Sequence, residues 1–136
     1  MIRPIMHDPL FLGQPSAPAT PADKQVALDL IDTLRAHAEG CVGMAANMIG
    51  VHKRIIVINP GFAPVVLINP VITQKSGPYQ AEEGCLSLSG VRKTTRYQEI
   101  DVCFLDMDFK PRQQHFSGYA AQIIQHEVDH CDGILI

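Results

Sequence analysis

The sequence lacks an excess of positive charge, a cysteine framework and a long apolar run, and each absence excludes a class of protein. It has 11 basic and 14 acidic side chains, so no strong positive field would hold a nucleic-acid backbone. Its four cysteines form no CxxC pair, which argues against disulfide or paired-cysteine frameworks. Residues 1–14 have no signal-peptide pattern, and no apolar run approaches the roughly 18 residues of a membrane span. We therefore expect a cytoplasmic protein without nucleic-acid or membrane partners.

The composition is typical of one folded domain. Hydrophobic residues make up 46% of the chain and charged residues 18%, which is too apolar for a disordered protein. A chain of 136 residues has the usual length of a single domain, so we expect residues 1–136 to share one hydrophobic core. Residues 1–22 are rich in proline and show no sustained period, which predicts an extended N-terminal arm over that domain.

Two segments have the apolar spacing of helices. Residues 23–38 place most of their apolar side chains three or four positions apart, with Asp23 suited to the N-cap and Gly40 just past the end. Residues 117–131 show a second helical pattern, which begins at Ser117 and stops at an Asp-Gly pair. Apolar residues cover more than one face of this second segment, so we expect it to be buried on several sides.

Three short segments have the pattern of strands. The β-branched runs 54–58 and 65–68 flank an Asn-Pro-Gly turn at 59–61, which predicts a hairpin. Alternation at 100–105 predicts a further strand, followed by a turn at 108–111. The order helix, strand, strand, strand, helix with short turns favours an α+β fold over regular βαβ units.

The strongest chemical signal is the HExxH sequence that begins at His126 and ends at His130. Four residues of helix bring two side chains onto one face about 5–6 Å apart, so both imidazoles can bind one metal ion. Glu127 lies beside them. An HExxH sequence can also be merely polar in an exposed helix, but here the surrounding apolar residues favour a metal site.

A metal site with two histidines needs a third protein ligand, and only six residues follow His130. We therefore expect that ligand upstream of the helix. The upstream candidates are Cys85, Glu82, Glu83, His115 and the remaining cysteines. Cys131 follows His130 directly, so on an α-helix its side chain is rotated by roughly 100° away from the two imidazoles, which makes it a poor candidate. Cys85 is favoured because glycine precedes it in a predicted loop and because a thiolate suits zinc or iron(II).

Three sequence blocks together resemble those of peptide deformylases. They are GMAANMIG at 43–50, EGCLS at 83–87 and QHEVDH at 125–130, in the order and with roughly the separations of that family. The LINP stretch at 67–70 stands where the family has a strand that enters the second block. The resemblance extends from about residue 24 to the end, and the three blocks together are far more specific than HExxH alone.

The resemblance implies small, mainly antiparallel β-sheets packed around a central helix that carries HExxH. It implies that Cys85, His126 and His130 hold one Fe²⁺ or Zn²⁺ ion, with Ni²⁺ or Co²⁺ also suited to these donors. Glu127 would be the general base and acid, and the Leu86 N–H would donate to the oxyanion. The implied reaction is hydrolysis of the formyl group from N-formylmethionyl nascent peptides at the ribosome, an N-terminal processing step of protein biosynthesis.

The chain departs from the family pattern at residues expected near the substrate. Met48 stands where the family has a glutamine that donates to the oxyanion, and Asn47 precedes it. Gln122 occupies a helix face where the family tends to have an apolar wall for the substrate methionine. Gly43 is expected to allow a close approach of the substrate, and Met44 and Met48 are expected to line its pocket.

Several charged residues and histidines carry no specific prediction. Arg92 and Arg96 could contact a peptide backbone or carboxylate, but exposed arginines are more often solvated, so we expect both on the surface. Four histidines lie outside the three blocks, and no role is predicted for them: His7, His37, His52 and His115.

Two other functions stay open at this stage. The first is a non-catalytic or weakly active deformylase-like protein that binds a metal and peptide N-termini, for which Met48 is the support. The second is a metallopeptidase that acts on internal peptide bonds, which is disfavoured because no ligand follows the HExxH helix.

Overall fold

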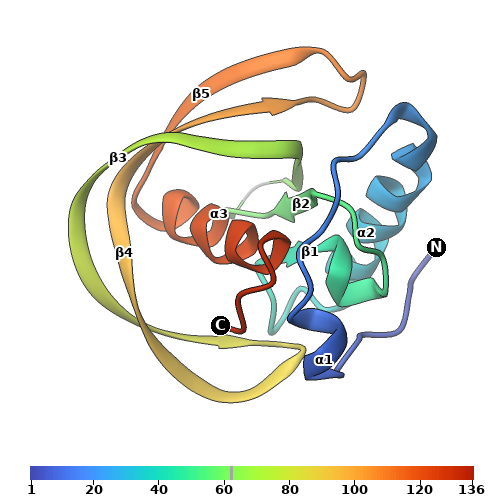
Figure 1. Ribbon diagram of the computed structural model, residues 1–136, viewed down its shortest axis with the longest axis horizontal. Helices are drawn as coiled ribbons and strands as arrows, with labels where there is room; N and C mark the ends of the chain where they lie inside the picture. The colour runs from blue at the N-terminus through green and yellow to red at the C-terminus, as the bar shows by residue number, and fades with distance from the viewer. Residues whose placement is uncertain (62) are drawn as a thin grey trace.

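The computed structural model describes residues 1–61 and 63–136, and it combines helices with a five-stranded antiparallel sheet. The predicted α+β class is confirmed. The strands lie in chain order: β1 (Gly43–Ala45), β2 (Ile55–Ile58), β3 (Val65–Cys85), β4 (Leu88–Leu105) and β5 (Pro111–Ser117). The α-helices are α1 (Pro9–Leu12), α2 (Lys24–Ala36) and α3 (Gly118–Cys131), and short 3-10 helices lie at η1 (Pro21–Asp23) and η2 (Ala46–Ile49). Figure 1 shows β3 and β4 curving around α3, with α2 on the other side of the molecule.

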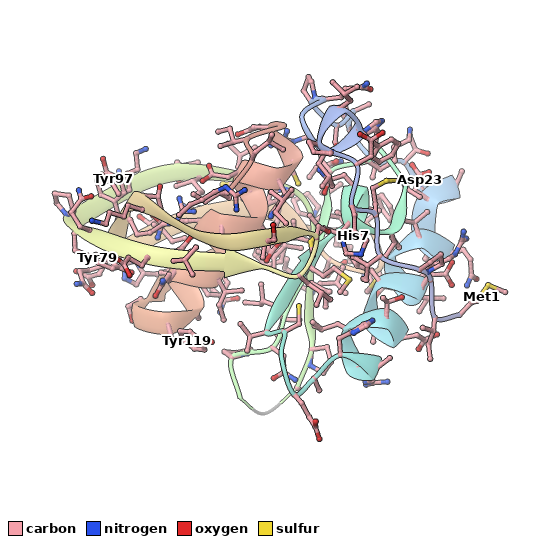
Figure 2. The ribbon with its side chains drawn as sticks, turned by 90° about the horizontal axis from the view of Figure 1, so that it is seen from below. Met1, His7, Asp23, Tyr79, Tyr97 and Tyr119 are labelled. Carbon is pink, nitrogen blue, oxygen red and sulfur yellow. The ribbon has the colours of Figure 1, made fainter. Side chains whose placement is uncertain are left out.

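The hairpin of β3 and β4 is much longer than the sequence pattern predicts. Strand β2 pairs with residues 65–68 of β3, which confirms the predicted hairpin there. Beyond that point β3 and β4 stay paired from Ile68–Leu105 to Cys85–Leu88. Most side chains in the distal part are exposed, so they give no apolar alternation. Figure 2 shows Tyr79 and Tyr97 where both strands bend, midway along this hairpin and far from α2.

The segments expected to be irregular contain additional structure. Residues 43–45, for which the sequence pattern predicts no strand, form β1, which pairs with β2 through Gly43 and Ile58. Residues 1–22, expected to be an extended arm, include the single turn of α1. That turn forms because the Asp8 carboxylate accepts from the Leu10 N–H at 3.0 Å and because Pro9 suits the first helical position.

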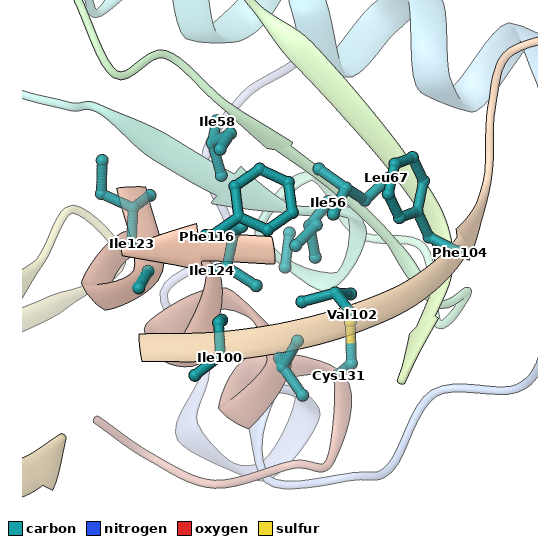
Figure 3. Packing of buried hydrophobic residues seen from close by; sticks show 13 residues of the cluster. Ile56, Ile58, Leu67, Ile100, Val102, Phe104, Phe116, Ile123, Ile124 and Cys131 are labelled. Carbon is teal, nitrogen blue, oxygen red and sulfur yellow. The ribbon is translucent and has the colours of Figure 1, made fainter. Parts of the chain in front are cut away.

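The apolar residues form two clusters, one on each face of the sheet. The alternation of β2 separates its side chains: Ile56 and Ile58 face the cluster around α3, whereas Ile55 and Val57 face the cluster around α2. Figure 3 shows the first cluster, in which Ile124 and Cys131 of α3 lie among side chains of the surrounding strands. Both helices are thereby fixed against the sheet. Within the described part of the chain, no helix has the length and apolar character needed to cross a membrane.

Candidate metal centre and active site

The ligating atoms of Cys85, His126 and His130 lie together, within 4.8 Å of one another. The Cys85 Sγ is 3.3 Å from the His130 Nε2, and this Nε2 is 3.2 Å from the Nε2 of His126. Helix α3 places both imidazoles on one face, because they are four residues apart. Cys85 comes from the last position of β3, so the long hairpin carries it to α3.

The donor set fits a divalent metal ion. The Nδ1 of His126 donates to the Glu83 carboxylate at 2.8 Å, which leaves the lone pair of the neutral ring on Nε2. This lone pair faces the His130 Nε2, and two neutral acceptor nitrogens at that separation repel unless a proton or an ion lies between them. A thiolate and two imidazoles are the donors that zinc and iron(II) accept. The three side chains could therefore hold such an ion.

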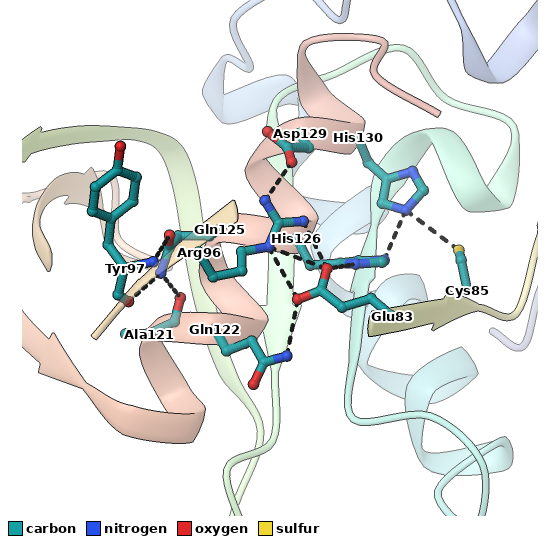
Figure 4. A network of polar contacts seen from close by, with 10 residues as sticks. All are labelled: Glu83, Cys85, Arg96, Tyr97, Ala121, Gln122, Gln125, His126, Asp129 and His130. Carbon is teal, nitrogen blue, oxygen red and sulfur yellow. Dashed lines mark hydrogen bonds and ion pairs between the residues drawn. The ribbon is translucent and has the colours of Figure 1, made fainter. Parts of the chain in front are cut away.

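A buried network fixes the orientation of His126. The Glu83 carboxylate accepts from Arg96 Nη2 at 2.7 Å and from Arg96 Nε at 3.0 Å. It also accepts from Gln122 Nε2 at 2.9 Å, and Arg96 Nη1 donates to Asp129 at 2.7 Å. Figure 4 shows Arg96 between Glu83 and Asp129, with Gln122 below. A partner of this kind holds a metal-binding histidine in one tautomer and one ring orientation.

The charges of this network are matched. Burial raises the pKa of the Glu83 carboxyl, but hydrogen bonds from His126, Arg96 and Gln122 outweigh it and lower the pKa to about 2. Burial also opposes the charge of Arg96, yet its bonds to Glu83 and Asp129 raise the pKa of the guanidinium above its usual value. Both groups are therefore ionised at neutral pH, and the pair is nearly inaccessible to water.

Glu127 lies in a less polar environment than Glu83. Its side chain is only 4% exposed, and its Oε1 has no hydrogen-bond partner among the described residues. Burial raises the pKa of its carboxyl to about 7, although the nearby His126 opposes the shift. A carboxyl group with a pKa near neutrality can both accept and return a proton, as acid–base catalysis requires.

Gly43 packs directly against Glu127. A Cβ at this position would lie 2.5 Å from Ile123 Cγ2 and 2.9 Å from Glu127 Oε2. Both contacts are shorter than a real Cβ tolerates, so any side chain at Gly43 would displace the carboxylate or the helix that carries it.

A cavity of about 200 Å³ opens beside these groups. Apolar side chains from three segments line it together with the metal-binding and acid–base candidates. They include Val42, Met48, Leu86, Tyr119 and Ile123. The cavity has space for a small acyl group and an adjoining apolar side chain. Ligand sites are usually concave and mostly apolar, with a few polar groups that orient the ligand, and this cavity has that form.

The whole chain matches the model of one family, described as polypeptide deformylase, over residues 2–136. The chain belongs to this family. A peptide deformylase of Clostridium beijerinckii is 59% identical over 136 residues, which is 100% of both chains. A peptide deformylase of Pelotomaculum thermopropionicum is 44% identical over 123 residues, which cover 88% of this chain and 79% of the relative.

Solved structures of deformylases share the fold. The crystal structure of the peptide deformylase from Thermotoga maritima superposes with a TM-score of 0.89 at 31% identity, over 99% of this chain and 95% of that one. The Met-Ala-Ser-bound class I type b enzyme from Acinetobacter baumannii also gives 0.89, at 28% identity over 99% and 97% of the two chains. The resemblance found in the three sequence blocks thus extends to the fold of the entire chain.

The structure places most of the expected deformylase residues at the cavity, but not all of them. Gly43, Met48 and Leu86 line it together with Cys85 and His126. Met44, expected to line the substrate pocket, does not line it. Its side chain points to the opposite face of the sheet and is fully buried in the cluster around α2.

The position of Asn47 explains why it cannot replace a glutamine at Met48. Its Nδ2 donates to the His130 carbonyl at 2.9 Å and lies 3.5 Å from the Leu12 carbonyl. Asn47 is buried and ties η2 to the end of α3. Its donor group is therefore committed to the backbone and does not line the cavity.

Two sequence expectations about this region are wrong. Arg96, expected on the surface, is 4% exposed, because Glu83 and Asp129 neutralise and hydrogen-bond its guanidinium. Cys85, expected in a loop, ends strand β3. Glu83 was considered only as a metal ligand, whereas its carboxylate instead orients His126. Strand register alone would not have revealed this contact, because Glu83 pairs with Arg92 and Arg96 pairs with Tyr79.

We expect substitution of Arg96 by methionine to lower the free energy of unfolding by about 3–5 kcal/mol at neutral pH. The change leaves the Glu83 carboxylate buried without its cation. The contribution of that carboxylate is fully present above its usual pKa of 4.5, and it is lost as the pH falls through about 2. Urea unfolding of the metal-free protein measures the effect. Arg92→Met is the control, because the Arg92 guanidinium makes a solvent-exposed hydrogen bond to the Ser89 carbonyl at 3.3 Å and no ion pair among the described residues; equal losses in both variants would contradict the prediction.

Proposed function

We propose that this deformylase holds one Fe²⁺ or Zn²⁺ ion with Cys85, His126 and His130, and that Glu127 moves the protons of formyl-amide hydrolysis. The observation that carries the proposal is the convergence of these three ligands beside a buried carboxyl group and a cavity. Nickel and cobalt suit the same donors, so the chain does not select one ion by donor type.

The metal would supply a Lewis acid and lower the pKa of water at the site toward neutrality. Glu127 would take a proton from the attacking water as that water adds to the formyl carbon. It would return the proton to the leaving nitrogen as the carbon–nitrogen bond breaks, which gives formate and a free α-amino group. The raised pKa of the Glu127 carboxyl suits both transfers.

The backbone and the cavity wall would orient the substrate. The Leu86 N–H would donate to the oxygen that becomes negative when water adds to the carbonyl. Gly43 would let the formylated N-terminus approach Glu127, because no Cβ stands between them. Met48 would contribute an apolar surface, since its thioether sulfur accepts from the Ala45 N–H at 3.5 Å and offers no donor.

The proposed substrates are N-formylmethionyl peptides, which the protein would bind as nascent chains at the ribosome in the cytoplasm. The Acinetobacter baumannii relative, whose solved structure holds Met-Ala-Ser, supports this class. Met-Ala-Ser is the peptide that remains when the formyl group is removed from formyl-Met-Ala-Ser.

Release of formate from formyl-Met-Ala-Ser tests the proposal, measured with iron and with zinc. We expect turnover with at least one ion and none with acetyl-Met-Ala-Ser, because the site beside Gly43 is small. Binding of the formylated peptide without formate release would instead identify a non-catalytic binding protein, the alternative that Met48 favours. Cleavage of internal peptide bonds would identify a metallopeptidase and overturn the proposal.

We expect Cys85→Ala to lose most of its bound metal, because two imidazoles alone form an incomplete site. Metal analysis after dialysis against a weak chelator measures the change. Cys41→Ala is the matched control, because Cys41 also lines the cavity but lies outside the ligand cluster. Near-stoichiometric metal in Cys85→Ala would show that another residue is the third ligand.

A further inference from the structure

Two adjacent residues near the N-terminus bind two separate segments that contribute to the cavity lining. The Met6 N–H donates to the Met48 carbonyl at 2.7 Å. The His7 Nδ1 donates to the Ser87 carbonyl at 2.9 Å. Met48 and Leu86, the neighbour of Ser87, both line the cavity. Figure 2 shows His7 beside the end of the β3–β4 hairpin where this turn lies. One short piece of chain thus joins the η2 segment to the turn.

The turn held by His7 is not fixed by regular strand pairing. Gly84 pairs with Val91, but the next residue, Cys85, pairs with Leu88, so the register shifts at this point. The shift leaves two unmatched residues in β4, one of which is Gly90 at a φ of 84°. The irregular end of the hairpin is also the part that carries a metal ligand and Leu86. The His7 hydrogen bond comes from outside the hairpin, so it constrains the turn where the strand hydrogen bonds of β3 and β4 do not.

We propose that His7 is a positioning residue, which holds the Leu86–Ser87 turn against the Met48 segment and so sets the direction of the Leu86 N–H. This inference rests on the proposed function, in which that N–H donates to the oxyanion. The His7 side chain lies outside the cavity lining, so it acts through the turn and does not touch the substrate.

The chemistry of the contact needs a donor and no charge. A carbonyl oxygen only accepts, so the Nδ1 of His7 carries a hydrogen in both the neutral and the protonated ring. Asparagine places an amide N–H at the position of Nδ1 along the side chain, and it can keep the bond. Phenylalanine keeps the ring and removes the donor.

The chain contains a matched control, a second imidazole–carbonyl bond that involves the N-terminal segment. His52 Nε2 donates to the Phe11 carbonyl at 2.8 Å, and its ring stacks on Phe11 at a centroid distance of 3.8 Å. His52→Phe removes the same kind of imidazole–carbonyl bond from the same segment. Neither His52 nor Phe11 lines the cavity.

The experiment compares His7→Phe, His7→Asn and His52→Phe by steady-state kinetics on formyl-Met-Ala-Ser and by amide hydrogen exchange at Leu86. We expect His7→Phe to lower kcat about tenfold, which corresponds to about 1.4 kcal/mol, with little change in KM. We expect the Leu86 amide to exchange faster in His7→Phe than in the other two proteins. His7→Asn should recover most of kcat, and His52→Phe should retain it.

Each result has a defined consequence. Wild-type kcat and exchange in His7→Phe would overturn the positioning role, as would equal losses of kcat in His7→Phe and His52→Phe. Failure of His7→Asn to recover kcat would also overturn it, because the lost donor would then not be the cause. If the wild-type protein releases no formate with iron or zinc, the proposed function fails. The exchange comparison then still decides whether His7 orders the turn.

Discussion

Replacing Glu127 with glutamine is expected to lower kcat by about 10²–10⁴-fold while the bound metal remains. Glutamine has almost the same shape as glutamate, but its amide neither accepts a proton from water nor returns one to the leaving nitrogen. The side chain is buried, so no solvent-exposed base can take its place without a shift of α3. Formate release under saturating formyl-Met-Ala-Ser measures kcat, and metal analysis of the same samples verifies occupancy.

Glu82 provides a matched control for the loss of a carboxylate near the site. It also lines the cavity, but it is exposed and outside the ligand cluster. Glu82→Gln should keep kcat close to that of the wild type. Full activity of Glu127→Gln with metal bound would contradict the assigned proton transfers. A large loss of kcat in both variants would indicate that the negative charge of the cavity, rather than one general base, is responsible.

The sequence predicted the parts of the fold in which one face is buried. Strand β2 alternates between two apolar clusters, and α3 is surrounded by apolar residues, so both leave a strong periodic pattern. The distal halves of β3 and β4 have little buried surface, and the pairing of these two strands begins with residues 37 positions apart, Ile68 with Leu105. Strand propensity depends on the residues of one short segment, so it cannot reveal a pairing between distant segments.

The ligand cluster and its support were predictable to different degrees. The two histidines are four residues apart on one helix, so local geometry alone brings them together. Cys85 was favoured by donor chemistry and by the resemblance. The support of His126 depends on Glu83 and Arg96, which meet only because β3 and β4 are paired near Glu83. A buried ion pair formed by tertiary structure has no local signal, so Arg96 was predicted to be an ordinary surface residue.

The burial of Met44 has a similar cause. Met44 and Met48 are both apolar and lie in the same sequence block, so composition cannot distinguish a core residue from a cavity residue. In the structure both methionines are buried in the cluster around α2, but η2 also places Met48 in the lining of the cavity, which Met44 does not reach. The alternation of a strand and the turn of a short helix thus determine which methionine reaches the site.

The end of the hairpin connects these observations to catalysis. Cys85 and Leu86 are consecutive, so a motion of the turn would move the proposed metal ligand and the proposed oxyanion donor together. The register shift at Gly84 and the bond from His7 act on the same few residues. Precise placement of donors before the reaction is the main source of electrostatic catalysis, so under the proposed mechanism a constraint on this turn would affect the rate directly.

Replacing Met48 with glutamine is expected to raise kcat, with little change in KM, because the added amide donor acts mainly on the charge that develops in the transition state. One oxyanion donor is worth on the order of 10²–10³ in rate, and the metal charge should reduce the gain to the lower part of that range. Glutamine matches methionine in length, so it fits the buried space. Asn47 donates to the His130 carbonyl and supplies no donor there.

Met48→Leu is the control, since it keeps an apolar side chain without a donor and should leave kcat low. Formate release by the three metal-loaded proteins gives kcat and KM. An unchanged or lower kcat in a folded, metal-loaded Met48→Gln protein would mean that another group already fills the donor position.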